Sequence, residues 1–338
     1  MLARAAVRLS PTAARLGATT AVRTPVRLNS SRAALIKELR AITSAPMKKC
    51  VDALAEANGD VQEAVTLLRK AGLAAAAKKA GRGASEGAAA IAYGSSGEAA
   101  LMELNSETDF VARNEIFQEL CSSVARTALG VAPASGDAMQ EVDTAALGAS
   151  QLGDGQSVTE ALGVAVSQLG ENLVLRRACL LSPPASGGVV AGYVHNAYAK
   201  NVGKTAAAVV LASSAADTAA LRALGEKLSM HVVAATPQFL DSSSVDAAAM
   251  QRERDFQLEQ AKASGKPDHI AEKMVEGRMK KYYADVCLVD QTYMIDETAG
   301  SVRKVLEAAG KELGAPVSLA AFVRYTVGEG VEVAAEEA

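Results

Sequence analysis

The residue types that most often carry out catalysis or bind metals are sparse and scattered in this sequence. It has three histidines, His195, His231 and His269, and four cysteines, none of which forms a CxxC pair. Metal sites and nucleophilic enzymes need such side chains at defined spacings. So few cysteines in 338 residues do not indicate a disulfide framework either. We therefore predict no catalytic set, no bound metal and no cofactor.

One short motif, Gly203-Lys204-Thr205, resembles the end of a phosphate-binding loop. The full motif has another glycine five positions before Gly203, where this chain has Tyr198, and it continues into a helix. Here residues 206–211 are apolar and predict a strand instead. Both requirements fail, so we expect no nucleotide to bind through this motif. An enzyme that uses this region is the competing hypothesis.

A polar stretch from Asn105 to Arg113 contains a single large aromatic residue, Phe110. The apolar residues 99–104 before it predict a strand, and a helical pattern begins at Asn114. Loops at such junctions often carry function because rigid elements hold them on both sides. Phe110 either packs against its own core, which is the commoner outcome for an aromatic residue, or anchors a partner. The residues alone leave both possibilities open.

Composition limits the kinds of partner. The chain is 49% hydrophobic and its formal net charge is −3. This small charge does not indicate a nucleic-acid binder. No apolar run approaches the roughly 20 residues that a membrane-spanning helix needs. We therefore expect a soluble protein without a membrane or a direct nucleic-acid partner.

The first 31 residues differ from everything after them. Six arginines precede the first acidic residue, Glu38, and Ser, Thr and Ala fill the intervals without a sustained apolar segment. This composition is typical of an organelle transit peptide, and the near-helical spacing of the arginines favours the mitochondrion over the plastid. A disordered basic tail is the alternative. We predict that residues 1–31 are a transit peptide and that the protein resides in the mitochondrial matrix.

The remaining sequence predicts an α+β protein built from successive units. Helical periodicity in residues 33–73 indicates a small module of three short helices, the third ending at Gly72. Residues 74–87 are basic and Ala-rich and are expected to form a helical linker. Two further blocks, residues 88–184 and 185–332, each show a hairpin of strands followed by a helix. Each block is therefore expected to be an α+β subdomain with its own antiparallel sheet and helices on one face.

Two segments depart from this plan. Residues 130–156 are rich in Ala, Gly and Ser and are interpreted as a surface excursion. Residues 245–283 contain two charged helical stretches joined by Ser264-Gly265-Lys266-Pro267, where Gly suits a helix end and Pro a helix start. This pattern predicts an antiparallel helical hairpin that projects from the second subdomain.

The polar stretch and the helical hairpin resemble a known family. Thr108-Asp109-Phe110-Val111, with the following Asn114-Glu115, is similar to the signature loop of translation elongation factor Ts. The run from Gly265 to Lys281 resembles the helical-hairpin motif of that family almost letter for letter. The block Gly170-Glu171-Asn172 matches as well.

The resemblance extends from Leu35 to Glu332, so it implies properties for nearly the whole chain. Residues 33–73 would be a module of the ubiquitin-associated (UBA) type with which this family begins. The protein would be a guanine-nucleotide exchange factor for mitochondrial elongation factor Tu and would make no covalent bond itself. A binding adaptor without exchange activity is the competing hypothesis, against which the intact Thr108-Asp109-Phe110-Val111 argues.

The resemblance also implies particular partner-binding residues. Phe110, helped by Asp109, would insert between helices of the GTPase and disturb the Mg²⁺ and the phosphate-binding loop that hold GDP. His195 would be a contact in the other subdomain, although a core or strand-end histidine is the alternative. The positions that match the family's contacts are Met47, Thr108, Asp109, Phe110, Val111, Leu169, Gly170 and His195.

Overall fold

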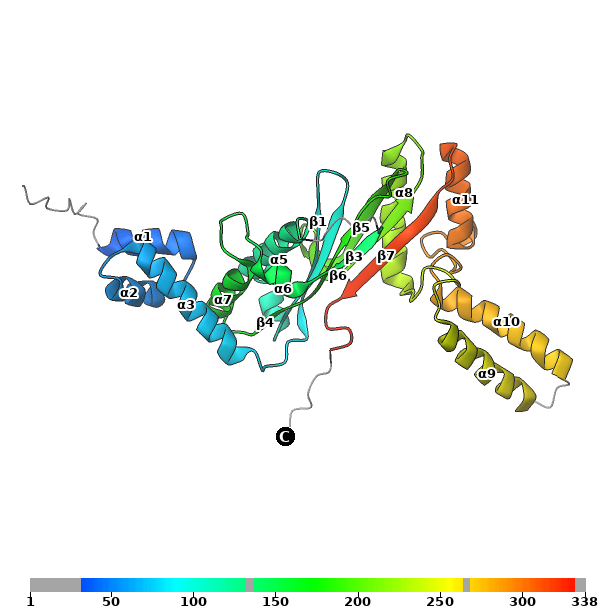
Figure 1. Cartoon of the computed structure of the whole chain (residues 1–338), viewed down its shortest axis with the longest axis horizontal. Helices are drawn as coiled ribbons and strands as arrows, with labels where there is room; N and C mark the ends of the chain where they lie inside the picture. The colour runs from blue at the N-terminus through cyan, green and yellow to red at the C-terminus, as the bar shows by residue number, and fades with distance from the viewer. Residues whose placement is uncertain (1–31, 132–136, 264–267, 332–338) are drawn as a thin grey trace, which may run out of the picture.

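The computed structural model describes residues 32–131, 137–263 and 268–331, so the predicted transit peptide lies outside the described residues. Figure 1 shows an elongated molecule, with helices at one end, a sheet with covering helices in the middle and a helical hairpin at the other end. The helices are α1 (Arg32–Thr43), α2 (Met47–Glu56), α3 (Val61–Lys79), α4 (Asp109–Ala112), α5 (Glu115–Ala128), α6 (Thr144–Ala149), α7 (Val158–Leu169), α8 (Thr218–Ala235), α9 (Ala247–Ala263), α10 (Asp268–Val286), the 3-10 helix η1 (Glu297–Ala299) and α11 (Val302–Leu313). The strands are β1 (Glu86–Tyr93), β2 (Ala99–Ser106), β3 (Met139–Val142), β4 (Leu173–Leu181), β5 (Gly188–Ala199), β6 (Val202–Ala212) and β7 (Ser318–Thr326).

The strands of the described chain form one antiparallel sheet in the order β3-β4-β2-β1-β6-β5, with β7 also paired to β6. The α+β class is confirmed, but the expectation of two separate sheets is wrong. The halves join where β1 meets β6, through the pairs Ala89–Gly203 and Ala90–Val202. Alternation along a strand indicates which face is buried but not which strand lies beside it, so the sequence pattern did not reveal this junction.

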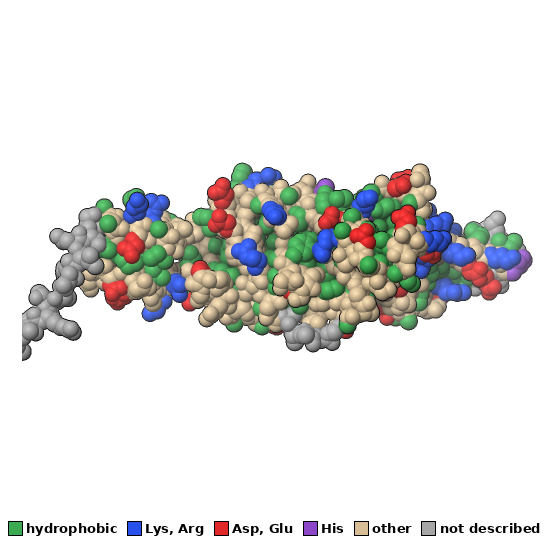
Figure 2. All heavy atoms as spheres, turned by 90° about the horizontal axis from the view of Figure 1, so that it is seen from above, with side chains coloured by type: hydrophobic (Ala, Val, Ile, Leu, Met, Phe, Trp, Pro, Cys, Tyr) green, Lys and Arg blue, Asp and Glu red, His purple; other side chains and the backbone are tan. Residues whose placement is uncertain are grey.

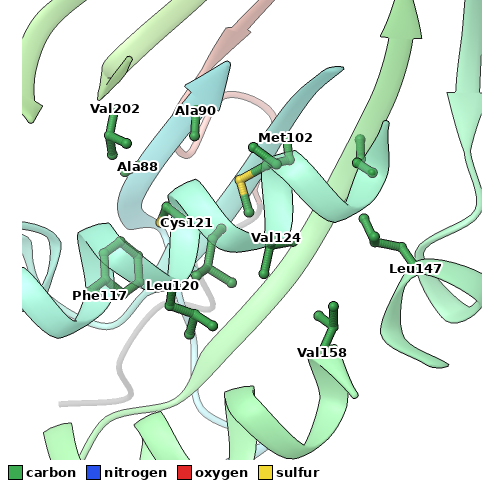
Figure 3. Packing of buried hydrophobic residues seen from close by; sticks show 14 of the residues in the cluster. Ala88, Ala90, Met102, Phe117, Leu120, Cys121, Val124, Leu147, Val158 and Val202 are labelled. Carbon is green, nitrogen blue, oxygen red and sulfur yellow. The ribbon is translucent and has the colours of Figure 1, made fainter. Parts of the chain in front are cut away.

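Each half of the sheet has its own outer core. In the first half, α5 and α7 cover one face of β1, β2 and β4. Figure 3 shows this core, in which Phe117, Leu120 and Cys121 of α5 gather with Ala88 and Ala90 of β1. In the second half, α8 and α11 cover the outer face of β6 and β7. The helices therefore lie on the outside of both halves.

The opposite faces of the two halves pack against each other. Ile91 and Leu101 from the first half share one buried cluster with Val210 and Tyr325 from the second. A side chain on Gly192 of β5 would meet the side chain of Ile91, its Cβ lying 2.9 Å from the Ile91 Cδ1 atom. The sheet therefore folds over on itself. Its strands are buried on both faces and carry apolar side chains on both.

The segment of residues 130–156 is more ordered than a surface excursion. Outside residues 132–136, which lie beyond the described part of the chain, it contains the edge strand β3 and the helix α6. β3 pairs with β4 from Met139 opposite Leu181 to Val142 opposite Ala178, and Leu147 of α6 is fully buried. Four- and six-residue elements are too short to show periodicity, which explains why the sequence reading missed them.

Helix α3 continues through Gly72 to Lys79, so the expected end at Gly72 is wrong. Gly72 lies where α3 crosses α7, and a Cβ on it would be 2.9 Å from the backbone carbonyl carbon of Gly163. A Cβ on Gly163 would in turn be 3.0 Å from the backbone nitrogen of Leu73. Both glycines serve close backbone approach between two helices rather than termination of one.

Hydrogen bonds also hold the N-terminal helices against α7. The Lys49 ammonium group donates to the Ser167 carbonyl at 2.8 Å, and the Gln168 side-chain amide donates to the Thr43 carbonyl at 2.7 Å. A small core around Leu39 and Cys50 packs α1, α2 and α3 together. These helices are therefore packed onto the body, while their UBA-type relationship stays a prediction.

The helices α9 and α10 form a pair that projects from the far end of the body (Figure 1). They pack on each other through Ala261, Val275 and Met279. At their base, the Phe239 amide donates to the Val286 carbonyl at 3.1 Å, and the Leu288 amide donates to the Phe239 carbonyl at 2.9 Å. The turn between the helices, residues 264–267, lies outside the described residues.

A buried carboxylate, Glu103 of β2, connects both halves of the sheet. It accepts hydrogen bonds from Arg176 at 3.0 Å and Arg177 at 2.6 Å, both on β4, and from the Gly328 amide after β7 at 3.0 Å. The Arg177 guanidinium also lies 4.3 Å from the ring centre of Tyr325. A buried charge is tolerated only when it is paired and hydrogen-bonded, and these donors supply that compensation.

His231 is a second buried polar group, on α8. The Met294 amide donates to its Nδ1 atom at 3.2 Å, so the proton of a neutral ring is on Nε2, which lies 3.0 Å from the Gln291 Oε1 atom. Burial lowers the pKa of His231, and the hydrogen bond with Gln291 opposes this shift. His231 therefore ties α8 to the segment after α10 and is a structural residue in this fold.

We predict that Gly72→Ala destabilises the protein. Overpacking against the Gly163 backbone costs about 1–3 kcal/mol, which exceeds the gain of up to about 1 kcal/mol in helix propensity. Gly277→Ala is the matched control, since Gly277 lies within α10 with open space at its Cβ position. Urea unfolding should show a lower midpoint for Gly72→Ala and an equal or higher one for Gly277→Ala. A raised midpoint for Gly72→Ala would contradict the close crossing.

We predict that Glu103→Ala lowers the free energy of unfolding by about 3 kcal/mol, because it leaves two arginines and a backbone amide without their shared acceptor. The magnitude stays at the lower end since Arg176 and Arg177 keep part of their hydration. Glu119→Ala, at an exposed position of α5, is the control and should change stability little. Denaturant unfolding measures both, and equal midpoints for the two variants would rule out this role of Glu103.

Stability should fall as the pH drops from about 6.5 towards 5 because of His231. Its folded-state pKa lies below the unfolded value of about 6.5, so the unfolded chain binds the proton more readily in this window. The stabilisation is complete above the unfolded pKa and is lost below it. In His231→Gln, the dependence of the urea midpoint on pH between 7 and 5 should become shallower. An unchanged pH dependence in that variant would assign the effect to other groups.

Candidate functional site

The candidate site is the junction between β2 and α5, where Thr108 precedes the one-turn helix α4. Within α4, Val111 and Ala112 are buried, whereas 80% of the Phe110 surface is exposed. The core interpretation of Phe110 is therefore wrong. Asp109 beside it is also exposed, and its carboxylate lies 3.8 Å from Arg113. The loop thus presents one large apolar ring next to one acidic group, with Val111 as its anchor in the core.

The start of α4 is held by a residue from a distant part of the chain. The Thr108 amide donates to Glu171 Oε2 at 2.9 Å, and the Thr108 hydroxyl donates to Glu171 Oε1 at 2.6 Å. The Ser106 hydroxyl donates to the Thr108 carbonyl at 2.9 Å. Thr108 occupies the N-cap position of α4, but its side chain makes no capping hydrogen bond. Its hydroxyl is used for the contact with Glu171 instead.

A second set of contacts joins the same two segments. The Asn172 amide donates to the Glu107 carboxylate at 2.6 Å, and the Asn172 side chain donates to the Arg82 carbonyl at 2.8 Å. The Arg82 guanidinium lies 3.4 Å from the Glu107 carboxylate. Hydrogen bonds therefore run both ways between the two segments, from Thr108 to Glu171 and from Asn172 to Glu107.

These contacts bring Leu169 and Gly170 beside the loop, as neighbours of Glu171. Leu169 is half-buried at the end of α7, and Gly170 is exposed. Gly170 terminates α7 in the left-handed conformation with φ 83°, and its carbonyl accepts a hydrogen bond from Lys79 of α3. A left-handed helix end suits glycine, since a Cβ would be strained there.

On its other side the loop reaches β5. The Arg113 guanidinium lies 5.3 Å from the centre of the Tyr198 ring, a cation–π contact. Tyr198 lies at an irregularity of β5, where the pairing with β6 shifts register between Ala197 and Ala199, and Asn196 shortly before it has a φ of 49°. This irregularity bends the end of β5 so that Tyr198 packs against the first core. The loop is therefore supported from β5 as well as from the α7–β4 turn.

His195 lies on β5, three residues before Tyr198, and its side chain is exposed, so the core interpretation is wrong. Its Nδ1 atom is 3.2 Å from the Tyr193 hydroxyl. These two residues line an open pocket together with Met230 and Arg324. His195 is thus a surface histidine on the same strand whose end supports the loop.

Met47 is separate from this cluster. It is the first residue of α2, at the N-terminal end of the molecule (Figure 1), and 57% of its surface is exposed. The structure thus groups Thr108, Phe110 and Gly170 at one site, whereas His195 lies three residues before Tyr198, the β5 residue that contacts the loop. Sequence reasoning assigned no role to Glu171 or Glu107. The sequence pointed to Glu171 only through the block Gly170-Glu171-Asn172, which resembles the family. Contacts between distant segments leave no local pattern in the sequence.

The phosphate-loop candidate is part of a strand. Gly203, Lys204 and Thr205 lie in β6, where Gly203 pairs with Ala89 of β1, and the Lys204 ammonium group lies 3.5 Å from the Glu86 carboxylate. A strand engaged in sheet pairing cannot wrap its amides around a phosphate. The rejection of this motif therefore agrees with the structure.

The cysteines also do not form a reactive centre. All four are buried and free. Burial raises the pKa of Cys179 and of Cys287 to about 11, so both thiols are protonated at neutral pH. In the part of the chain that the structure describes, no cluster of three or more His, Cys, Asp or Glu side chains is arranged to hold a metal ion. No helix among the described residues has the length and apolarity to cross a bilayer.

The charged groups give the surface a mixed character. Figure 2 shows acidic and basic side chains interspersed over the body on the face in view, with both signs also present towards the end that carries the hairpin. Phe110 differs from this mixed surface as an exposed aromatic ring on a hydrogen-bonded loop, and exposed aromatic side chains on rigid supports are typical of interface anchors.

Comparison with known proteins assigns the chain to a family. Residues 107–329 match the family model described as elongation factor TS. The chain is 45% identical over 305 residues to elongation factor Ts of Rhodospirillum centenum, covering 90% of this chain and 95% of the relative. It is 48% identical over 301 residues to elongation factor Ts of Paramagnetospirillum magneticum, covering 89% and 92%. Elongation factor Ts of Rhodospirillum rubrum is also 48% identical over 301 residues, with 89% and 93% covered. The chain therefore belongs to the elongation factor Ts family.

Proposed function

We propose that this protein accelerates the release of GDP from elongation factor Tu during translation elongation. The observation that carries the proposal is Phe110, an almost fully exposed aromatic ring on a loop fixed by hydrogen bonds to Glu171 and by the buried Val111. Such a ring contributes little to the stability of its own fold, so its burial is available to a partner. Because the loop is already ordered, binding costs little conformational entropy.

The mechanism is a coupling of two binding equilibria. Insertion of Phe110 and Asp109 near the Mg²⁺ and phosphate-binding loop of the GTPase weakens its hold on GDP. By thermodynamic linkage, GDP weakens the binding of the exchange factor by the same factor. The factor therefore speeds release without selecting which nucleotide returns. It breaks no covalent bond and requires no cofactor.

Further contacts in the proposed complex come from the other predicted positions. Thr108, Val111, Leu169 and Gly170 belong to or adjoin the cross-linked loop, and His195 lies on the strand that supports it. Met47 gives the N-terminal helices, which we propose to be of the UBA type, a separate contact with the GTPase. Two separate points of attachment, one on the N-terminal helices and one on the central body, would restrict the orientation of the protein on its partner.

We further propose that the partner is the mitochondrial form of elongation factor Tu and that the protein resides in the mitochondrial matrix. The support is the sequence of residues 1–31, which is rich in arginine and contains no acidic residue. Import of a fluorescent fusion carrying these residues, compared with one lacking them, tests the location. A fusion that stays in the cytosol would contradict it.

The exchange proposal predicts that Phe110→Ala slows GDP release without unfolding the protein. Loss of an aromatic anchor typically costs 2 kcal/mol or more, so the accelerated rate should fall about 30-fold or more. The measurement is release of a fluorescent GDP analogue from elongation factor Tu. Phe256→Ala is the matched control, since it removes another exposed phenylalanine, on α9.

The outcomes separate the two functional hypotheses. Fast release with the wild type and with Phe256→Ala, and slow release with Phe110→Ala, supports exchange through the loop. No acceleration by the wild type, with binding retained, would leave a non-exchanging adaptor. Equal acceleration by the wild type and Phe110→Ala would support the exchange function but show that Phe110 does not carry it.

A further inference from the structure

The loop that carries Phe110 has little intrinsic stability. α4 contains four residues, and its closing hydrogen bonds run from the Arg113 amide to the Asp109 carbonyl at 3.3 Å and from the Asn114 amide to the Val111 carbonyl at 2.9 Å. Helices of this length do not persist alone in water, because nucleation costs more than so few hydrogen bonds return. Its N-cap residue, Thr108, supplies no capping bond. The conformation of α4 must therefore be imposed from outside.

Glu171 supplies the strongest polar contact at the start of α4. Its two carboxylate oxygens accept from the amide and the hydroxyl of Thr108, at 2.9 and 2.6 Å. Hydrogen bonds to an ionised carboxylate are roughly twice as strong as those between neutral groups. A bidentate contact of this kind fixes both the position and the rotation of the Thr108 backbone, from which the direction of Phe110 follows two residues later.

Glu171 is itself held firmly enough to act as a support. It lies between Gly170, which ends α7, and Asn172, which is buried and hydrogen-bonded to Glu107 and Arg82. The next residue, Leu173, starts β4 and pairs with Ser106 of β2. Elements fixed on both sides leave the Glu171 backbone little freedom. The carboxylate is therefore presented at a set distance from the end of β2.

We propose that Glu171 is a positioning residue that holds the Phe110 loop in its binding conformation and joins it to the neighbouring Leu169–Gly170 surface. This inference rests on the proposed exchange function, for which it names a residue that acts through another. Glu171 keeps the loop ordered before the GTPase arrives. Without Glu171, the loop samples other conformations and has to be ordered during binding.

This role has a specific kinetic signature. When only a fraction of the molecules holds the binding conformation, the apparent affinity falls by that fraction, whereas the bound complex is unchanged. Glu171→Ala should therefore raise the concentration of exchange factor that gives half-maximal GDP release about tenfold, with a much smaller change in the maximal rate. Phe110→Ala instead lowers the maximal rate, because it removes the inserted group. A residue that only stabilises the fold would not change the half-maximal concentration separately from the maximal rate of GDP release.

Amide hydrogen exchange of the isolated protein gives a second readout that does not depend on the GTPase. In Glu171→Ala, the hydrogen-bonded amides of the loop, those of Thr108, Arg113 and Asn114, should exchange about tenfold faster, while those of the sheet keep their protection. Glu171→Gln keeps one carbonyl acceptor and should fall between the wild type and Glu171→Ala. Thr108→Val removes the hydroxyl donor alone and should resemble Glu171→Gln. Adding Thr108→Val to Glu171→Ala should have no further effect, because the two groups act as one contact.

The controls and contrary outcomes are separable. Glu312→Ala removes an exposed carboxylate at the end of α11 and should match the wild type in both readouts. Unchanged loop protection and unchanged half-maximal concentration in Glu171→Ala would overturn the proposal, as would a loss of protection spread over the whole sheet. If the wild type fails to accelerate GDP release, the exchange function is lost, but the hydrogen-exchange comparison still decides whether Glu171 orders the loop.

Discussion

The carboxylate of Glu103 holds together the parts of the molecule on which the candidate site depends. It is fully buried, and its donors come from β4 and from the turn after β7, so it connects the first half of the sheet with the end of the chain. The direct strand pairing between the halves, from β1 to β6, spans only two residue pairs. A buried carboxylate keeps its partners in place, because separating them leaves it without compensation.

The strands that Glu103 cross-links are the strands that carry the candidate site. β2 ends at Ser106, immediately before the Phe110 loop, and β4 begins at Leu173, immediately after Glu171 and Asn172. Pairing of Ser106 with Leu173 places these two chain ends side by side. The reciprocal hydrogen bonds of Glu107 and Glu171 then extend the ladder beyond the last strand residues. The site thus continues from the paired ends of two strands whose positions are fixed. This explains how a one-turn helix can hold an exposed aromatic ring.

Close helix packing attaches the N-terminal helices to the same framework. Gly72 and Gly163 let α3 and α7 touch, and α7 ends at Gly170, directly before Glu171. Lys79, at the end of α3, donates to the Gly170 carbonyl, so the C-terminal ends of these two helices are also joined. The orientation of the helices that carry Met47 is therefore set through the element that also supports the loop. Small residues at such a crossing are a tertiary requirement with no counterpart in helix propensity, since Gly is a poor helix former.

Local chemistry in the sequence was sufficient for the α+β class, for most helices and strands and for the identity of the β2–α5 junction. Periodicity, capping residues and turn residues act over a few positions, so they can be recognised in the sequence before the fold is known. The sequence also suggested Phe110 as a special residue but left its direction open. Only the tertiary structure decided that its ring faces solvent, because exposure depends on what packs around the loop.

Apart from the short elements β3 and α6, the features that the sequence did not reveal involve groups far apart along the chain. The single sheet depends on β1 beside β6, the continuation of α3 depends on Gly163, and the order of the loop depends on Glu171. None of these partners lies within a helical turn or a hairpin of the residue it contacts, so no short-range pattern encodes the pairing. The sequence by itself therefore determined the elements and the candidate loop. Tertiary structure decided their partners and the direction of Phe110, because burial and hydrogen bonding between distant segments arise only when the chain has folded.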